Sequence, residues 1–359
     1  MIRYQNREIN KFKTISALEA HNLVKSYNRG ADRVLDGIDI VVPEGCLFSV
    51  LGSSGCGKTT LLRLLAGLDT PDSGTILVDG KVVTGPGTFV PPEERNIGYV
   101  FQEFALFPHL DVRSNIDFGL RQMESARRAD RVAEVMDLLD LTDLATRMPH
   151  SLSGGEQQRV AVARSIAPFP RVLLMDEPFS SLDASLRQET RHQIRRVLKN
   201  QDITTILVTH DQEEALSVAD TIAILSRNGI EQVGTPESVY YRPASEFVAR
   251  FLGRTNLIES VSHGNTATTK IGVLSIDRQV TGNVVLSIRP EHLSLRKPGS
   301  SASEVVGRVV TREFKGHDIT FEVMVDSTPF LVHTDNQVQF SPGDEVVVYA
   351  VQPAVVLNS

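Results

Sequence analysis

Residues 52–59 read GSSGCGKT, and this octapeptide constrains the fold of the chain more than any other stretch. It follows a compact apolar run, CLFSVL, and precedes a helix-forming run, TTLLRLLAG. The pattern G-x-x-x-x-G-K-[ST] between a buried strand and a helix is typical of a P-loop, whose backbone N–H groups cradle phosphate oxygens. We therefore expect nucleotide phosphates to contact Gly52, Ser53, Ser54, Gly55, Cys56, Gly57, Lys58, Thr59 and Thr60.

Within this loop, Lys58 is expected to reach the β- and γ-phosphates as a point charge, and the Thr59 hydroxyl to coordinate Mg²⁺.

A second segment, which ends in acidic residues, fits the same site. Residues 171–177 read RVLLMDE, a buried strand that ends in two carboxylates. Asp176 is expected to hold Mg²⁺ through water. Glu177 is expected to orient and polarise the attacking water. The alternative is an acidic pair that caps a helix.

Residues 207–210, LVTH, end another predicted strand. The carboxyl ends of parallel strands meet at one edge of a sheet, so His210 is expected beside the two carboxylates, within reach of the γ-phosphate. A lone histidine is more often structural. Its place at a strand end next to these carboxylates favours a catalytic role.

Strand-like and helix-like runs alternate from about residue 17 to residue 240, which indicates a mostly parallel sheet with helices on both faces. Residues from about 103 to 168 interrupt this alternation with helical patterns, so we expect an inserted helical subdomain. Residues 1–16 form an N-terminal extension without periodicity. Residues 241–359 contain β-branched runs separated by Gly, Pro, Asp and Asn, which indicate a small all-β barrel or sandwich domain.

The bulk composition excludes several classes of protein. The net charge is −7, which argues against nucleic acid as a partner. No apolar run reaches the roughly 18 residues that span a bilayer. Cys46 and Cys56 are too few for a disulfide framework, so a reducing, cytosolic compartment is expected.

Residues 151–156, SLSGGE, predict the first turn of a second helix suited to an anion, about a hundred residues after the P-loop. No lysine follows it. With this stretch the chain resembles the ATPase subunits of ABC transporters, because it matches the signature of that family and lies 23 residues before Asp176, counted from residue 153 (176 − 153 = 23). The resemblance runs from about residue 17 to the C-terminus. Kinases and GTPases share the P-loop, so the P-loop alone does not exclude them. A kinase has no use for the signature at residues 151–156, and a GTPase would need a guanine-reading N-K-x-D, which is not found.

The resemblance implies roles for further residues. Gln102 resembles the glutamine that meets Mg²⁺ and the water, Tyr27 the aromatic that stacks on adenine, and residues 180–183, SSLD, the loop that touches the opposite subunit. In this family two subunits form a homodimer around two ATP molecules. Ser153, Gly154 and Gly155 would then bind the partner's γ-phosphate in trans, where the partner's own P-loop lysine supplies the missing cation. Glu156 departs from the commonest glutamine of the signature, and residues 165–170 carry an extra proline.

Residues 286–292, LSIRPEH, resemble a segment of the OB-like regulatory domain found on bacterial importer ATPases. The expected fold is therefore an α/β P-loop NTPase with an inserted helical subdomain, followed by a small all-β, OB-like domain. The implied cofactors are ATP and Mg²⁺. The implied partners are two integral-membrane permease subunits that dock near residues 103–120 and, through them, a periplasmic or lipid-anchored substrate-binding protein. The implied location is peripheral, on the cytoplasmic face of the cell (inner) membrane.

Phe104, Leu106 and Phe107 are candidates for this docking surface, with internal packing of the subdomain as the alternative. The pair Gln102–Glu103 and the segment 313–318, EFKGHD, look most like ferric-iron importers. Import of polyamines, sulfate, phosphonates or sugars remains open, as does a regulatory ABC protein that does not transport. A His–Asp pair in a turn is usually structural, so no iron site is expected at residues 317–318.

Overall fold

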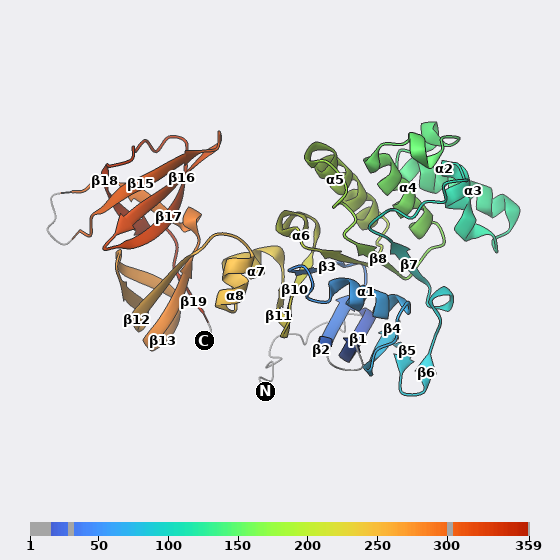
Figure 1. Ribbon diagram of the computed structural model, residues 1–359, viewed down its shortest axis with the longest axis horizontal. Helices are drawn as coiled ribbons and strands as arrows, with labels where there is room; N and C mark the ends of the chain where they lie inside the picture. Colours follow the sequence, from blue (N-terminus) through green and yellow to red (C-terminus); the bar gives the residue numbers. More distant parts are fainter. Residues whose placement is uncertain (1–15, 28–31, 300–303, 358–359) are drawn as a thin grey trace. The chain divides into compact units, whose positions relative to one another are not determined.

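The computed structural model describes residues 16–27, 32–299 and 304–357, which form two compact units (Figure 1). The first unit ends at Pro236, a few residues before the boundary expected at 240, and the second begins at Glu237. The earlier boundary has a physical reason, because the guanidinium of Arg289 donates to the Tyr240 carbonyl at 2.9 Å and so binds helix α7 (Pro236–Tyr241) to the β-rich unit. The extension expected at 1–16 lies outside the described residues except for Ser16.

A six-stranded sheet carries the first unit, in the order β11-β10-β3-β9-β8-β7. Its strands are β3 (Leu47–Gly52), β7 (Ile97–Val100), β8 (Val172–Asp176), β9 (Thr205–Thr209), β10 (Thr221–Ser226) and β11 (Gly229–Gly234). All neighbouring pairs are parallel except β10–β11. The predicted parallel sheet is confirmed, and the carboxyl ends of β3, β7, β8 and β9 lie along one edge.

Both faces of this sheet are buried. Every residue of β3, β8 and β9 is buried. Leu174 and Val208 join the hydrophobic cluster that contains helix α1 (Lys58–Ala66), whereas their neighbours Met175 and Leu207 join the cluster on the other face. Alternate strand residues point to opposite faces, so continuous apolar runs are what a covered sheet requires.

An antiparallel sheet that the sequence reading did not predict completes the first unit. Its order is β2-β1-β4-β5-β6, from β1 (Ser16–Tyr27), β2 (Asp32–Pro43), β4 (Ser73–Val78), β5 (Lys81–Gly85) and β6 (Thr88–Phe89). Leu18, Ile40 and Ile76 from this sheet share the cluster of α1. The sheet therefore packs on the same side as the P-loop helix.

The predicted helical subdomain lies between β7 and β8. It contains α2 (Val112–Asp117), α3 (Ser125–Leu138) and α4 (Gly154–Ile166), which gather at one end of the first unit in Figure 1. Helices α5 (Ala184–Asn200) and α6 (Gln212–Val218) follow β8 and β9. Within the described residues, the longest helices are too short or too polar to cross a bilayer.

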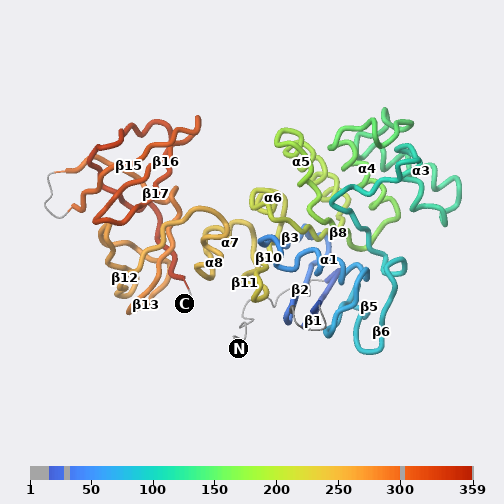
Figure 2. Tube along the Cα trace, in the orientation of Figure 1, coloured from blue at the N-terminus to red at the C-terminus, as the bar shows by residue number. Residues whose placement is uncertain are grey.

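The second unit is built from antiparallel strands, and Figure 2 traces it from α7 and α8 (Glu246–Phe251) into a long hairpin. One sheet holds β12 (Asn256–Thr269), β13 (Gly272–Ile288) and β19 (Val355–Val356). The other holds β14 (Leu293–Arg296), β15 (Gly307–Phe314), β16 (Asp318–Val325), β17 (Thr328–Asp335) and β18 (Glu345–Ala350). One hydrophobic cluster joins the two sheets. The predicted all-β domain is confirmed.

The segment 289–291 has a structural role in this unit. Arg289 is 3% exposed and also donates to the carbonyls of Ala249, Gly253 and Arg254, while the Glu291 carboxylate accepts from the Tyr240 hydroxyl at 2.9 Å. A buried guanidinium stays stable only when its N–H groups are paired, and here backbone carbonyls supply the partners.

Candidate functional site

The P-loop places a buried ammonium group at the start of α1. Gly57 caps the helix at φ 100°, and a Cβ there would lie 2.7 Å from Leu35 Cδ2, so only glycine fits. No side chain caps the first turn. Lys58 is 5% exposed, and its Nζ donates to the carbonyls of Gly52 at 2.8 Å and Ser53 at 3.0 Å. The lysine thus holds the loop closed around the N-terminus of the helix.

Asp176 meets the P-loop at the sheet edge. Its Oδ1 accepts from the Thr59 hydroxyl at 3.2 Å, and its Oδ2 from the Tyr99 hydroxyl at 3.3 Å. Burial raises the pKa of the Asp176 carboxyl, an effect opposed by these two hydrogen bonds. Burial beside Asp176 also raises the pKa of the Tyr99 phenol, which keeps it a donor. The sequence analysis did not predict a role for Tyr99. Its position near the end of a short apolar strand could have indicated one.

Glu177 turns away from Asp176. Its φ of 43° lies in the left-handed region that non-glycine residues rarely adopt, and its N–H donates to the Val208 carbonyl at 2.9 Å. The carboxylate thereby reaches His210 Nδ1 at 3.0 Å. The Gln102 amide donates to Glu177 at 3.5 Å and to the Ser180 hydroxyl at 3.4 Å. The structure therefore brings three predicted residues, Gln102, Glu177 and His210, to a single point.

These three residues line a cleft of about 580 Å³, which Arg187, Thr209, Asp211 and Glu214 also border. Glu214 was not singled out from the sequence. It looks there like one of two acidic residues in a solvated first helical turn, and only its burial in the structure distinguishes it from Glu213.

Tyr27 ends β1 and is 40% exposed. Its hydroxyl donates to Asp69 at 2.8 Å, and the ammonium of Lys25 lies 5.2 Å from the ring centroid. These contacts fix the ring, and its stacking on adenine stays a prediction.

The first turn of α4 is completed by its own side chains. Ser153 accepts from the Glu156 N–H at 3.3 Å, while the Glu156 carboxylate accepts from the Ser153 N–H at 2.7 Å and its hydroxyl at 2.8 Å. This is a capping box. These hydrogen bonds lower the pKa of Glu156, so it is ionised at neutral pH. The S-x-x-E spacing of residues 153–156 is typical of a capping box and could have predicted this cap.

Gly155 has a packing role as well as a predicted donor role. A Cβ at this position would lie 2.8 Å from Thr190 Oγ1 and 2.9 Å from Leu186 Cδ1, so its absence lets α4 approach α5.

The apolar residues of loop 103–110 differ in whether they fit a docking surface or internal packing of the subdomain. Phe104 and Leu106 pack against the core of the subdomain, which favours internal packing for them. The ring of Phe107 lies 4.3 Å from that of Phe118, at a tilt of 42°. Phe118 is 36% exposed, and its ring lies 4.1 Å from the guanidinium of Arg121. The candidate apolar surface therefore pairs Phe107 of this loop with Phe118, which directly follows α2.

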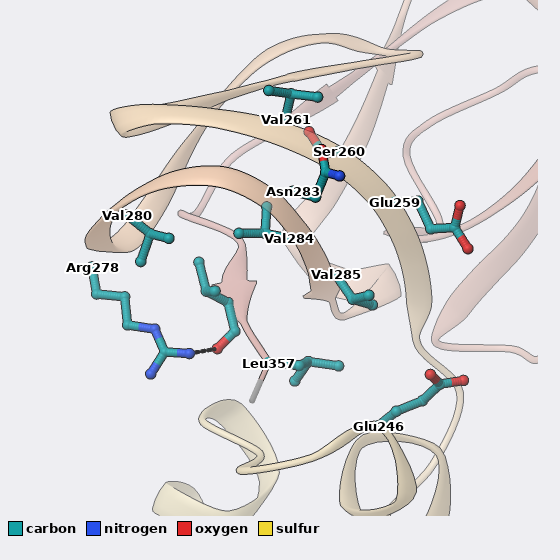
Figure 3. Close-up of a pocket in the computed structure, with 11 residues that line it drawn as sticks. Glu246, Glu259, Ser260, Val261, Arg278, Val280, Asn283, Val284, Val285 and Leu357 are labelled. Atoms are coloured by element: carbon teal, nitrogen blue, oxygen red, sulfur yellow. Dashed lines mark hydrogen bonds between the residues drawn. The ribbon is translucent and has the colours of Figure 1, made fainter. Parts of the chain in front are cut away.

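A larger cavity of about 780 Å³ lies in the second unit (Figure 3). Val261, Val280 and Val284 line it, with Glu259 from β12 at one side. Arg278 donates to the Val356 carbonyl at 2.9 Å. None of the residues predicted to bind nucleotide lines this cavity, whereas Gln102, Glu177 and His210 line the cleft of the first unit, so the nucleotide chemistry is assigned to the first unit.

Comparison with known proteins agrees with this geometry. The family described as ABC transporter matches residues 35–180, and the TOBE domain family matches residues 286–357. The spermidine/putrescine import ATP-binding protein PotA of Methylococcus capsulatus is 39% identical, over 95% of this chain and 96% of the relative. The Fe(3+) ions import ATP-binding protein FbpC 2 of Rhodococcus jostii is 40% identical, over 94% of this chain and 98% of the relative.

A solved dimer of the ATP-binding cassette MJ0796, bound to ADP and Pi, is 29% identical, with a TM-score of 0.54 over 61% of this chain and 98% of that one. The chain therefore belongs to the ABC transporter ATP-binding proteins, among the ATPases that power import and carry a C-terminal TOBE domain.

Proposed function

We propose that this ATPase powers the import of ferric iron, with the residues of the first-unit cleft in the roles predicted for them. The observation that carries the catalytic part is the convergence of Lys58, Thr59 and Asp176 with Gln102, Glu177 and His210 at one sheet edge. The cargo rests on the resemblance of residues 102–103 and 313–318 to ferric-iron importers and on relatives named for Fe(3+) import. Polyamine import is the second candidate, because equally similar relatives are named for spermidine and putrescine.

The donor set at Asp176 fits Mg²⁺. A hydroxyl and a carboxylate already meet at 3.2 Å, and Mg²⁺ prefers oxygen ligands while keeping waters and substrate phosphates as the others. No cluster of three or more His, Cys, Asp or Glu side chains suited to a metal occurs in the described ranges. Thr59 and Asp176 would hold the ion directly or through water, and Gln102 would meet it from the subdomain side. Bound there, Mg²⁺ would neutralise charge on the β- and γ-phosphates.

Glu177 is the residue we assign to the attacking water. Its carboxylate accepts from His210 and Gln102, so both partners fix its direction. A fixed carboxylate can take the proton of a water in line with the γ-phosphate, while Lys58 balances charge on the phosphate oxygens. His210 would contact the γ-phosphate from the same edge.

Two copies of the chain would complete two such sites. Ser153, Gly154 and Gly155 would present the first turn of α4 to the γ-phosphate bound by the partner. The loop 180–183 would lie at the same interface. The cassette MJ0796 is dimeric in its solved structure, which supports the pairing of two copies.

Two permease subunits would dock on residues 103–120, and the chain would lie peripherally on the cytoplasmic face of the cell membrane. Phe107 and Phe118 would supply an apolar contact there, and aromatic residues are enriched at protein–protein interfaces. Gln102 directly precedes this segment, so closure of the nucleotide site would move the docking surface with it. A periplasmic or lipid-anchored substrate-binding protein would act through the permeases.

Reconstitution tests the cargo. The chain and its permease partners are placed in proteoliposomes, and ATP hydrolysis is measured with candidate binding proteins loaded with Fe(3+) or with spermidine. Stimulation by the iron-loaded protein alone supports the proposal, whereas stimulation by the spermidine-loaded protein transfers it to polyamine import.

A further inference from the structure

A ring of hydrogen bonds encloses the turn that carries His210. The Thr209 hydroxyl donates to Glu214 Oε2 at 2.8 Å and accepts from the Asp211 N–H at 3.0 Å. Asp211 in turn caps α6 by accepting from the Glu214 N–H at 3.1 Å. His210 lies at the apex of this ring, with half of its side chain exposed and Nδ1 3.0 Å from Glu177. The position of its imidazole therefore depends on the backbone that the ring holds.

Glu214 is the buried member of this ring. It is 2% exposed, and its Oε1 has no hydrogen-bond partner among the described residues. A buried carboxyl with one unpaired oxygen is costly, and such groups persist where they serve another purpose. Neither the fold nor the predicted chemistry uses Glu214 otherwise.

Charged groups face Glu214 from three directions. Arg191 on α5 is 4% exposed and lies 3.8 Å from the second carboxylate oxygen of Asp211. Burial raises the pKa of Glu214 to about 7, with the Thr209 hydrogen bond and Arg191 opposing the rise and Asp211 and Glu177 adding to it. The Glu214 carboxyl therefore changes its protonation state near neutral pH.

We propose that Glu214 is a positioning residue for ATP hydrolysis, which acts through Thr209 to hold His210 against Glu177. This inference rests on the role assigned to His210 above. Small displacements of a reacting or orienting group are expensive, since an ångström can cost on the order of 100-fold in rate. Ionised Glu214 accepts the Thr209 proton more strongly than the neutral acid does, so turnover rises as pH passes 7.

Two substitutions in the full-length chain test this role. Glu214→Ala removes the acceptor and Thr209→Val removes the donor at similar volume. Each is expected to lower kcat by about 10-fold or more, with the KM for ATP changed by less than about 2-fold. The matched control is Glu213→Gln, since that neighbouring side chain is 81% exposed. A kcat equal to that of the control, or a raised KM at unchanged kcat, would overturn the proposal.

Combination with His210→Ala separates this inference from the role of His210 itself. We expect Glu214→Ala to add little to the loss already caused by His210→Ala, because both act through the imidazole. Fully additive losses would overturn the inference. If His210→Ala alone hydrolysed ATP normally, the assigned role of His210 would fail first.

The pH profile provides a readout that a purely structural role does not move. Glu214→Gln keeps the shape and an acceptor for Thr209, so it remains informative if the alanine variant does not fold. The wild-type kcat is expected to rise between pH 6 and pH 8, and this rise is expected to flatten in Glu214→Gln. A profile unchanged by the substitution would contradict the proposal.

Discussion

Helices α1 and α4 both start in glycine-rich sequence, but their first turns are completed in opposite ways. Gly57 caps α1 without a side chain, and Lys58 adds a cation. Ser153 caps α4 with its side chain, and the Glu156 carboxylate returns to the Ser153 N–H. The start of α1 thus offers donors and positive charge to a ligand, whereas the start of α4 is satisfied by its own residues and carries a negative charge. We propose that the first holds a nucleotide within one chain and that the second engages it only when a partner closes.

Glu177→Gln should have the largest effect, because it should stop hydrolysis while α1 and α4 both stay bound to ATP. The amide cannot take a proton from water, so ATP hydrolysis is expected to fall by about 10²- to 10⁴-fold. ATP binding at α1 should persist, and α4 should stay engaged, which light scattering would detect as a stable dimer in ATP. Normal hydrolysis in this variant would refute the role of Glu177.

Lys58→Ala should act on α1 alone. Loss of charge-assisted hydrogen bonds to phosphate is expected to weaken ATP binding by about 100-fold. Equilibrium binding of a fluorescent ATP analogue measures this effect, with Lys81→Ala, at an exposed position of β5, as control. Unchanged affinity would mean that backbone donors alone hold the phosphates, and α1 and α4 would then differ less than proposed.

Sequence patterns predicted α1 and its site better than α4. An apolar strand followed by polar residues fixes where Lys58, Asp176 and His210 must lie, because parallel strands end at one edge. The antiparallel sheet of β1, β2 and β4–β6 was not predicted, since half-buried strands such as β1 lack strict alternation. Glu214 could not be found, because burial depends on α5 and α6 packing together. Glu156 was noted only as a departure, although its spacing from Ser153 predicts a capping box.

Ser153→Ala should act on α4 alone. The expected result is a roughly 10-fold higher ATP concentration for dimerisation, equivalent to about 1.4 kcal/mol, because one donor to the partner's phosphate is lost. Removal of the cap should also lower the free energy of unfolding by about 1 kcal/mol. The matched control is Ser151→Ala, because the Ser151 hydroxyl donates to the Met148 carbonyl within its own turn.

Affinity for ATP in the monomer should not change in Ser153→Ala, because α1 sets it. A loss of monomer affinity comparable to that of Lys58→Ala would show that α4 contacts the nucleotide within one chain, and the division between the two helices would fail.

Glu156→Gln should have the smallest effect and tests the charge directly. Glutamine also closes a capping box, so the helix start is preserved while the negative charge is removed. At pH 7 the variant is expected to dimerise at an ATP concentration a few-fold lower than the wild type, because no carboxylate opposes the partner's phosphate. Dimerisation equal to that of the wild type would leave Lys58 alone as the difference between the two helix starts.

The pH dependence of stability checks the same carboxylate. Because the pKa of Glu156 is lowered in the folded chain, its stabilisation is complete above its unfolded value of 4.5 and is lost as pH falls through the folded value. Glu156 is partly exposed to solvent, so screening limits the effect to less than about 1 kcal/mol. Denaturant unfolding should therefore show the wild type losing slightly more free energy of unfolding than Glu156→Gln between pH 5 and pH 3. Equal losses would mean that the hydrogen bonds to Ser153 do not depend on the charge of Glu156.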